Sequence, residues 1–177
     1  MSQSDIEVRA ANGADLGAIV AIYAHHVRTG TASFEIDAPD GAEMARRWHE
    51  VVDRDLPYLV AVVGSEVVGY AYAAPYRPRP AYRFTVEDSV YVRADFARRG
   101  IGAMLLAELV SASERAGARQ MIAVIGDSAN AASIRLHAAA GFTKVGALAG
   151  VGWKFERWLD VVIMQRALGP GDARPAA

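Results

Sequence analysis

The sequence predicts one α/β (or α+β) domain of three layers, in which helices flank a mixed central sheet. The first observation is that runs typical of strands and of amphipathic helices alternate along the chain. The second is the length of 177 residues, which suits a single domain with a sizeable core. The third is the composition, 53% hydrophobic and 22% charged, which is that of a globular protein. We assign the domain to residues 1–168 and expect the Pro-, Gly- and Ala-rich residues 169–177 to form a flexible tail.

The first half of the chain is predicted to form three strands and two helices. Asn12 is a suitable cap for the first helix, whose apolar stripe includes Leu16, Tyr23 and Val27. A short connection led by Gly64 predicts a hairpin between the second and third strands. The strands are residues 6–10, 58–63 and 67–73, and the helices run from Asn12 and over residues 41–52.

The second half begins with an irregular loop, because residues 75–82 contain three prolines. Beyond this loop strands and helices alternate, and Gly117 and Gly141 stand where the two helices are expected to end. The strands are residues 84–92, 120–125, 143–149 and 158–166, and the helices are residues 100–116 and 130–140.

Two glycines stand where the helix at residues 100–116 begins. Gly100 and Gly102 allow the backbone to approach a ligand closely, and the unpaired N–H groups of a first helical turn attract an anion. Arg98 and Arg99 add positive charge beside them. We therefore predict a phosphate loop, made of Arg98, Arg99, Gly100, Ile101, Gly102 and Ala103.

Two known nucleotide-binding motifs match this loop less well. A P-loop requires Lys followed by Ser or Thr after the glycines, and neither pair is present. A dinucleotide fold is a more serious alternative, but its third small residue is Leu105 here, and residues 93–99 separate the strand from Gly100. A helix start that holds two glycines without a ligand is a further alternative. Gly102 argues against it, because glycine within a helix costs about 1 kcal/mol.

Several motifs follow one another in an order that is known from one family. The phosphate loop fits an R/Q-x-x-G-x-G/A pattern, except that the first position is Ala97. The next helix carries Asn130-x-x-Ser133-Ile134-x-Leu136-His137-x-x-x-Gly141-Phe142. The other motifs are Arg77-Pro78-Arg79-Pro80, Tyr82-Arg83, Thr85-Val86-Glu87, Ser89-Val90-Tyr91-Val92 and Lys154-Phe155-x-Arg157-Trp158-Leu159-Asp160. Over residues 6–168 the chain thus resembles the GCN5-related N-acetyltransferases, and within them the phosphinothricin and methionine sulfone acetyltransferase branch.

The resemblance implies that the phosphate loop binds the pyrophosphate of acetyl-CoA. It also implies that the strand segment Val90, Tyr91 and Val92 pairs with the pantetheine arm, and that a backbone N–H near Val90 stabilises the oxyanion. Asn130 caps its helix and matches an acetyl-CoA contact of the family, and Ser133 lies one turn later. Ala97 departs from the family pattern, which would weaken the diphosphate contact, but the backbone amides of the loop remain.

N-acetylation needs one group that takes a proton from the amine and another that protonates the leaving thiolate. Glu87 is the candidate acceptor, directly or through water, because burial in a central strand would raise its pKa; a structural pairing with a nearby arginine is the alternative. Asp88 points to the opposite face of the strand and is a weaker candidate. His137 stands where many family members have a general-acid tyrosine, so it is a candidate acid, and a packed structural histidine is the alternative.

Arg77 and Arg79 lie in a proline-stiffened loop and suit bidentate binding of a carboxylate or of a phosphinyl or sulfonyl oxygen; solvated surface arginines are the alternative. Together with the resemblance, they predict an enzyme that acetylates the α-amine of a small amino-acid-like substrate in a ternary complex. Acetylation of a polyamine, an aminoglycoside or a peptide N-terminus is one alternative, and a non-catalytic acetyl-CoA-binding module is another. The predicted substrate-binding residues are Phe34, Arg77, Pro78, Arg79, Tyr82, Glu87, Asp88 and Ser89.

Composition and charge limit the remaining possibilities. A net charge of −1 argues against a general nucleic-acid binder. The sequence has no long apolar run and no signal-like N-terminus, so we expect a cytoplasmic protein without membrane contact. The absence of cysteine excludes disulfides, thiolate metal sites and a cysteine nucleophile, and we predict no metal cofactor. The resemblance also implies a homodimer, and we expect Lys154, Phe155 and Trp158 to contribute to the pocket beside Phe34, across the dimer interface.

Overall fold

The structure is a computed structural model that describes residues 6–175; residues 1–5 and 176–177, the ends of the predicted domain and tail, lie outside the described residues. Its centre is a seven-stranded sheet in the order β1-β2-β3-β4-β5-β7-β6. Strands β4 and β5 are parallel, and all other neighbours are antiparallel. The strands are β1 (Ile6–Ala10), β2 (Tyr58–Val63), β3 (Glu66–Pro75), β4 (Thr85–Val92), β5 (Gln120–Gly126), β6 (Thr143–Lys154) and β7 (Arg157–Ala167). The helices are α1 (Leu16–Thr29), α2 (Gly41–Val52), α3 (Ile101–Arg115) and α4 (Ala131–Ala139).

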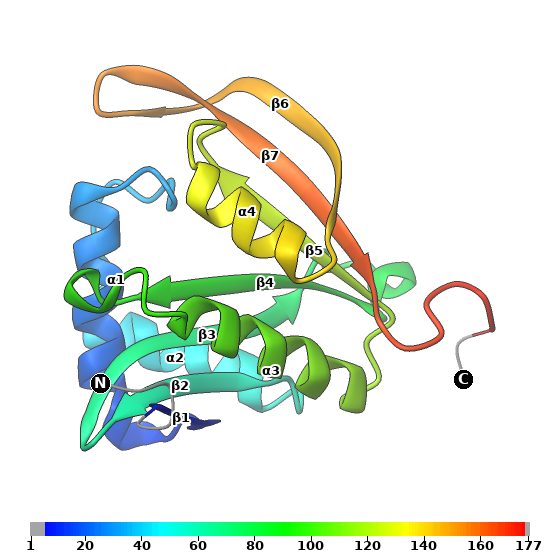
Figure 1. Cartoon of the computed structure of the whole chain (residues 1–177), viewed down its shortest axis with the longest axis horizontal. Helices are drawn as coiled ribbons and strands as arrows, with labels where there is room; N and C mark the ends of the chain where they lie inside the picture. Colours follow the sequence, from blue (N-terminus) through cyan, green and yellow to red (C-terminus); the bar gives the residue numbers. More distant parts are fainter. Residues whose placement is uncertain (1–5, 176–177) are drawn as a thin grey trace.

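Helices cover both faces of this sheet (Figure 1). On one face Ile19 of α1 and Met44 of α2 pack against Tyr70 of β3. On the other face Leu105 of α3 packs against Ala71, the next residue along β3. Successive residues of a strand point to opposite faces, so β3 contributes to both cores. The three-layer fold with a mixed sheet is therefore confirmed. None of the helices in residues 6–175 has the length and apolar character that crossing a bilayer would require.

The predicted elements of the first half are confirmed, with two differences, at β3 and at α1. β3 continues to Pro75, two residues beyond its predicted end and into the first residue of the predicted proline loop. Asn12 caps a 3₁₀ turn, Gly13–Asp15, and not α1 itself. The Asn12 side chain accepts a hydrogen bond from the amide of Ala14 (2.9 Å), and the Asp15 carboxylate accepts one from the amide of Asn12 (2.8 Å). This reciprocal capping box satisfies the first amides, and α1 follows directly from Leu16.

In the second half, the last two strands are longer than predicted. β6 and β7 pair as far as Lys154 and Arg157, and only Phe155 and Glu156 lie between them. Both turn residues have left-handed backbone angles, with φ of 51° and 56°. Such tight turns favour Gly, Asn or Asp, so Phe and Glu at these positions carry no turn signal.

The described part of the predicted tail folds back on the body of the protein. Residues 169–175 form short turns, and Gly171 is buried. The Arg119 guanidinium, at the start of β5, donates hydrogen bonds to the carbonyls of Arg174 and Pro175 (both 3.0 Å). The flexibility of the tail stays a prediction.

The feature that positions the site is a cleft between β4 and β5. These parallel strands pair only over Thr85–Asp88 and residues 120–123. Beyond Asp88 and Ala123, β4 stays paired with β3 as far as Val92, and β5 stays paired with β7 as far as Gly126. The two strands therefore part from each other, and we call the space between them the β4–β5 cleft.

Candidate active site

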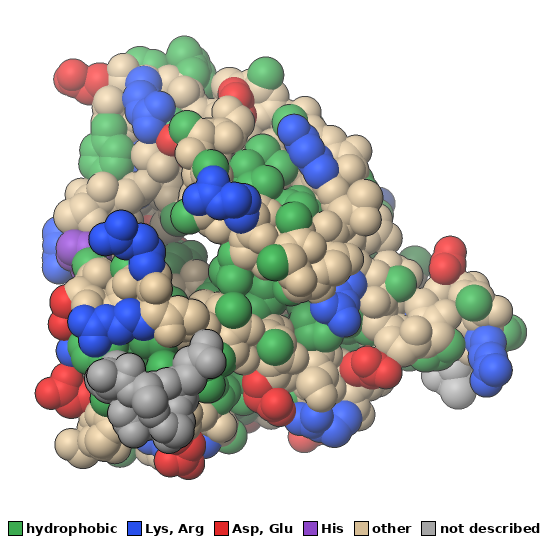
Figure 2. Space-filling view, viewed as in Figure 1, with side chains coloured by type: hydrophobic (Ala, Val, Ile, Leu, Met, Phe, Trp, Pro, Cys, Tyr) green, Lys and Arg blue, Asp and Glu red, His purple; other side chains and the backbone are tan. Residues whose placement is uncertain are grey.

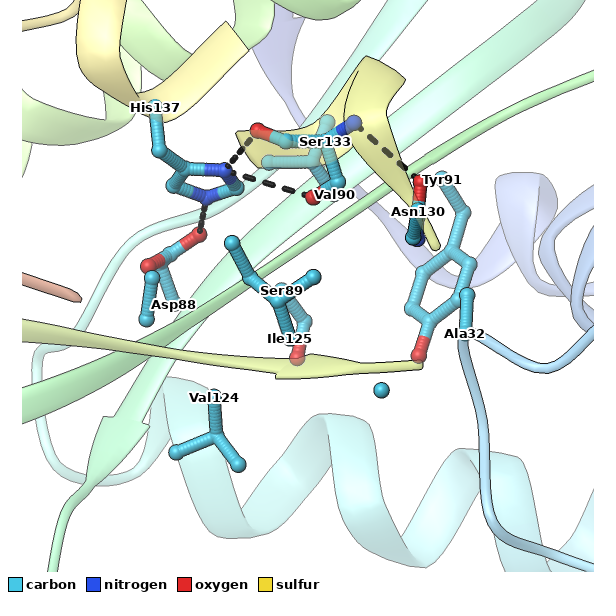
Figure 3. A pocket seen from close by; sticks show the side chains of 12 residues that line it. Ala32, Asp88, Ser89, Val90, Tyr91, Val124, Ile125, Asn130, Ser133 and His137 are labelled. Carbon is cyan, nitrogen blue, oxygen red and sulfur yellow. Dashed lines mark hydrogen bonds and ion pairs between the residues drawn. The ribbon is translucent and has the colours of Figure 1, made fainter. Parts of the chain in front are cut away.

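A cavity of about 50 Å³ lies in the β4–β5 cleft (Figure 3). Strand β4 forms one wall, β5 the other, and the first turns of α4 close one side, where His137 points toward β4. Ala32, from the loop between α1 and α2, contributes to the opposite side. The predicted site residues that line this cavity are Asp88, Ser89, Val90, Tyr91, Asn130, Ser133 and His137. The structure thus brings together residues from distant parts of the chain.

Inside the cavity, Asp88 and His137 form a buried pair. The Nε2 atom of His137 lies 2.9 Å from a carboxylate oxygen of Asp88, and both side chains are almost fully buried. The Nδ1 atom of the same ring lies 2.8 Å from the carbonyl of Ser133 and 3.3 Å from its hydroxyl. Burial by itself lowers the pKa of His137, but the bonds to Asp88 and Ser133 outweigh it and raise that pKa above its ordinary value.

The pairing of Asp88 with His137 was missed in the sequence. Asp88 was expected to bind substrate, and the structure instead shows one of its carboxylate oxygens on His137; a substrate contact stays a prediction. Strand alternation predicts that Asp88 and Glu87 lie on opposite faces of β4, and the structure confirms this. Asp88 faces α4, whereas Glu87 raises the pKa of Tyr72, which lies on the other face. No local signal could reveal a contact between residues 88 and 137.

Asn130 positions the helix that carries His137. Its side-chain oxygen accepts a hydrogen bond from the amide of Ser133 (3.2 Å), so it caps α4 as predicted. The amide of Asn130 in turn bonds to the carbonyl of Asp127 (2.9 Å), just beyond β5. These bonds fix the start of α4 at the mouth of the β4–β5 cleft.

The phosphate loop lies at the same mouth of the cleft, where α3 begins (Figure 1). Within residues 6–175, no acceptor of the protein bonds to the backbone amides of residues 98–103, whereas the amide of Met104 bonds to the carbonyl of Gly100 (3.1 Å). Arg98 and Gly100 have left-handed backbones, with φ of 63° and 83°, which curves these free amides into a concave donor surface. This geometry fits the predicted diphosphate site, and Ala97 does not disturb it.

Figure 2 shows a hollow on the face of the molecule where α3 and α4 begin, with Lys and Arg side chains beside it. The N-terminal ends of α3 and α4 both lie beside this hollow (Figure 1). Helix N-termini carry partial positive charge, so an anionic ligand is favoured here even though the net charge of the protein is −1.

Glu87 lies on the opposite face of β4 from Asp88. Among the described residues it has no ion pair, so the structural pairing with an arginine is not seen. Burial raises the pKa of Glu87, the neighbouring Asp88 raises it further, and Arg77 lowers it by a smaller amount. A half-buried carboxylate with a raised pKa is a suitable proton acceptor.

The predicted substrate arginines line a different cavity. Arg77, Pro78, Arg79 and Tyr82 surround a space of about 380 Å³ next to the start of β4. Of these residues, only Arg77 acts on the pKa of Glu87, and its guanidinium lies 5.0 Å from the centre of the Tyr76 ring. The structure therefore brings Arg77 near Glu87, and neither Arg77 nor Arg79 lines the cavity in the β4–β5 cleft.

Phe34 holds the loop between α1 and α2 against the sheet. A side-chain carbon on Gly126 of β5 or on Gly152 of β6 would collide with its ring. Lys154, which is buried, donates hydrogen bonds to the carbonyls of Gly30 (3.0 Å) and Ser33 (2.7 Å) in the same loop. This loop also places Ala32 in the cavity. Phe34 thus packs against β5 and β6 and does not line the cavity, so its contact with substrate stays a prediction. The sequence did not indicate the hydrogen bonds by which Lys154 holds this loop.

Met44, Trp48 and Val52 recur at helical spacing, which predicts core or interface residues, and all three belong to the core between α2 and the sheet. His26 bonds through Nε2 to the carbonyl of Val92 (2.8 Å), so this carbonyl already has a partner. Within the described part of the chain, no group of three or more His, Asp or Glu side chains is placed to hold a metal ion.

Comparison with known proteins agrees with this geometry. The model of the acetyltransferase (GNAT) family matches residues 19–142. A phosphinothricin N-acetyltransferase from Alcaligenes faecalis is 56% identical over 165 residues, which is 93% of this chain and 84% of the relative. An L-methionine sulfoximine/L-methionine sulfone acetyltransferase from Pseudomonas aeruginosa is 41% identical over 170 residues, 95% of this chain and 98% of the relative.

A solved structure shows the same fold with a bound ligand. It is a GNAT superfamily phosphinothricin acetyltransferase from Sinorhizobium meliloti in complex with AcCoA. Its TM-score is 0.95 at 44% identity, and the match covers 98% of this chain and 94% of the other. The predicted resemblance and the predicted co-substrate, acetyl-CoA, are therefore confirmed.

The free amides of the phosphate loop generate a prediction for Gly100. Replacing Gly100 with Asp places a negative charge at the start of α3, and we expect the dissociation constant for acetyl-CoA to rise at least about a hundredfold, or about 2.8 kcal/mol. Isothermal titration calorimetry measures this constant. Gly100→Asn is the matched control, because it carries the same left-handed backbone strain without the charge and should lose much less affinity. Equal losses in both variants would mean that strain, and not anion binding, explains the effect.

Proposed function

Because the chain belongs to the acetyltransferase (GNAT) family, we propose that it acetylates the α-amine of a small amino acid such as phosphinothricin, methionine sulfone or methionine sulfoximine. It is an acetyl-CoA-dependent N-acetyltransferase, and the proposal concerns its substrate and the residues that act. The observation that carries the proposal is the unpaired, half-buried Glu87 beside the β4–β5 cleft, with its raised pKa and Arg77 nearby. Relatives that cover nearly the whole chain act on amino acids of this type.

Acetyl-CoA supplies the acetyl group as a thioester when it is bound. In the proposal, the amides of the phosphate loop hold its diphosphate, with side-chain support from Arg98 and Arg99. Strand β4 offers backbone groups to the pantetheine arm, because beyond Asp88 its β5-facing edge has no partner strand. Within this segment of Val90, Tyr91 and Val92, the carbonyl of Val92 is already bonded to His26 and the carbonyl of Tyr91 faces Gly69 of β3, so Val90 is the better backbone donor and acceptor. Asn130 and Ser133 complete this side of the site.

In this proposal Glu87 takes the proton of the substrate amine, directly or through water. The amine must be uncharged to attack the thioester, and its ammonium form dominates at neutral pH. The raised pKa of Glu87 makes it a stronger base than an exposed carboxylate. His137 is the second proposed catalytic residue, as an acid toward the leaving thiolate. Both of its ring nitrogens have protein partners, so this role requires a way to pass the proton on.

The role of Glu87 is tested with Glu87→Gln, which has nearly the same shape and cannot accept a proton. We expect turnover to fall roughly 10²- to 10⁴-fold. Because the pKa of Glu87 is raised, wild-type activity should fall as pH decreases through a value above the ordinary range of Glu, and this acidic limb should be absent in the variant. Steady-state rates measured against pH check both points. A variant with nearly full activity would mean that another group accepts the proton.

The substrate class is tested at the arginines. A carboxylate or phosphinyl oxygen held by Arg77 or Arg79 loses its bidentate partner when either becomes Ala, and Lys does not restore the planar fork. We expect a raised KM for methionine sulfone or phosphinothricin and an unchanged KM for acetyl-CoA. Arg115→Ala is the control, since this exposed guanidinium pairs with Glu108 on α3. If both arginine variants keep the wild-type KM, or if the decarboxylated amine is an equally good substrate, the carboxylate site is rejected.

The assembly that we propose is a homodimer formed through the β6–β7 hairpin. This hairpin exposes an unusual number of large apolar side chains, and an apolar patch of this kind typically marks an interface. The tryptophans at its tip, Trp153 and Trp158, are 55% and 65% exposed and contact each other. The exposed apolar residues of the hairpin are Val145, Leu148, Val151, Trp153, Phe155 and Trp158. A cytoplasmic location without nucleic-acid or membrane partners is part of the same proposal.

The dimer is tested with Trp158→Glu, which places a charge in the most exposed part of the patch, at the tip of the hairpin. We expect the protein to become monomeric, because burying an unpaired carboxylate in an apolar interface is costly. Size-exclusion chromatography with light scattering measures the mass. Trp158→Phe keeps the surface apolar and should remain dimeric. A wild type that is already monomeric at micromolar concentration would contradict the proposal.

A further inference from the structure

A chain of three side chains leads from the interior of the protein to the β4–β5 cleft. Asp88 contacts His137 through Nε2, and His137 contacts the Ser133 hydroxyl through Nδ1 (Figure 3). All three residues line the same cavity. Asp88 and His137 are 7% and 4% exposed, whereas Ser133 is only half-buried and is the member closest to solvent. The chain therefore has a buried end at Asp88 and an accessible end at Ser133.

The partners of His137 determine where its protons are. A carbonyl oxygen can only accept, so the Nδ1 atom that lies 2.8 Å from the Ser133 carbonyl carries a proton. An ionised carboxylate likewise only accepts, so the Nε2 atom facing Asp88 carries the second proton. His137 is then an imidazolium paired with the Asp88 carboxylate. This agrees with the raised pKa of His137.

The protonated Nδ1 atom of His137 also determines whether the Ser133 hydroxyl donates or accepts toward the ring. Nδ1–H of His137 donates mainly to the Ser133 carbonyl (2.8 Å) and, as the longer branch, to the Ser133 hydroxyl (3.3 Å), so the hydroxyl oxygen accepts from the ring and its own O–H is left free to donate. The second carboxylate oxygen of Asp88 has no hydrogen-bond partner among the described residues, although it is buried. The ring cannot present either N–H to the cleft without breaking a bond to the protein. The Ser133 hydroxyl can donate to the cleft with both bonds of the ring intact.

We propose that Asp88, His137 and Ser133 form a proton relay for the leaving thiolate, in which Ser133 delivers the proton and Asp88 is a positioning residue. This inference rests on the proposed acetyl transfer and assigns a part to Asp88 and Ser133 in it. When the C–S bond of the thioester breaks, the thiolate takes the proton of the Ser133 hydroxyl. The Nδ1 proton of His137 then moves to the Ser133 oxygen, and the ring becomes neutral. The Nε2 proton stays on the ring and keeps its hydrogen bond to the Asp88 carboxylate. Solvent restores the imidazolium before the next turnover.

A single charged group acts on the His137 ring, so the relay can be tested by changing that one group. Asp88 of β4 is the charged group that acts on the ring among the residues that the structure describes. On its own helix Ser133 is the neighbour, and Phe142, just after α4, packs edge-on against the ring with centroids 5.1 Å apart. The β5 residues that share the cavity, Ala123, Val124, Ile125 and Gly126, carry no charge. Removing the Asp88 carboxylate therefore removes the single charge that stabilises the imidazolium.

The first measurement is a ¹⁵N NMR titration of the histidine rings in the ligand-free protein, with the His137 signals assigned from His137→Gln. We expect both ring nitrogens of His137 to be protonated at neutral pH, and Asp88→Asn to bring its pKa down to or below the ordinary imidazole value. Asp15→Asn is the matched control, because Asp15 is also a buried, ion-paired carboxylate but pairs with Arg9 far from the cleft. A wild-type His137 that titrates at or below the ordinary value overturns the proposal, and this result does not depend on the folding of Asp88→Asn.

The second measurement is the pH dependence of kcat with a saturating amino-acid substrate. The relay requires the imidazolium, so activity should be lost as pH rises through the pKa of His137, and Asp88→Asn should move this alkaline limb to lower pH. A merely structural Asp88 would lower stability without moving the limb, as we expect for Asp15→Asn. An alkaline limb that stays in place in Asp88→Asn overturns the positioning role.

The third measurement is Ser133→Ala, which keeps the backbone amide that Asn130 caps. We expect kcat to fall at least about tenfold, with the His137 pKa still raised. Ser113→Ala, on α3 and outside the cavity, is the control. A Ser133→Ala enzyme with the kcat of the wild type overturns the delivery step. The substrate proposal can fail while the relay holds. If the wild type prefers another amine, all three measurements can be made with that amine.

Discussion

The fold depends on the point at which β4 and β5 stop pairing. Each strand is held on its other side, β4 by β3 as far as Val92 and β5 by β7 as far as Gly126, so neither can follow the other as the sheet twists. Because the two strands are parallel, both end on the same side of the sheet, and the connections to α3 and α4 start there. One break in pairing thus produces the cavity, exposes a strand edge and brings two helix N-termini to its mouth.

Strand alternation then divides the chemistry between the two faces of β4. Glu87 and Asp88 are neighbours, but one carboxylate faces the side of α1 and α2 and the other faces α4. Their environments differ accordingly: Glu87 has no ion pair among the described residues, and Asp88 is paired with His137. The proposed proton acceptor and the proposed imidazolium therefore lie on opposite sides of one strand and do not neutralise each other.

The elements, the place of the two glycines at the start of α3 and the family could be predicted from the sequence because their signals are local. A cap such as Asn130, the apolar period of α2 and the glycines of the loop all act within one or two turns. The contacts that complete the site join distant residues. Lys154 reaches Gly30 and Ser33, and His137 reaches Asp88, with no pattern in the sequence that connects them. The place of Arg79 away from the cleft depends on an irregular loop, whose path proline content alone does not determine.

The free energy needed to bury the Asp88–His137 pair argues that the pair is kept for function. Moving two charges out of water is expensive, and their attraction repays this only with good geometry and further hydrogen bonds. Here the ring has both of its bonds, but one carboxylate oxygen of Asp88 has none within the described residues, so the desolvation of that oxygen is not compensated there. Apolar side chains of similar size would fill this space at a lower cost. What an apolar pair could not provide is a protonated ring that is held in one orientation against Ser133 at the wall of the cleft.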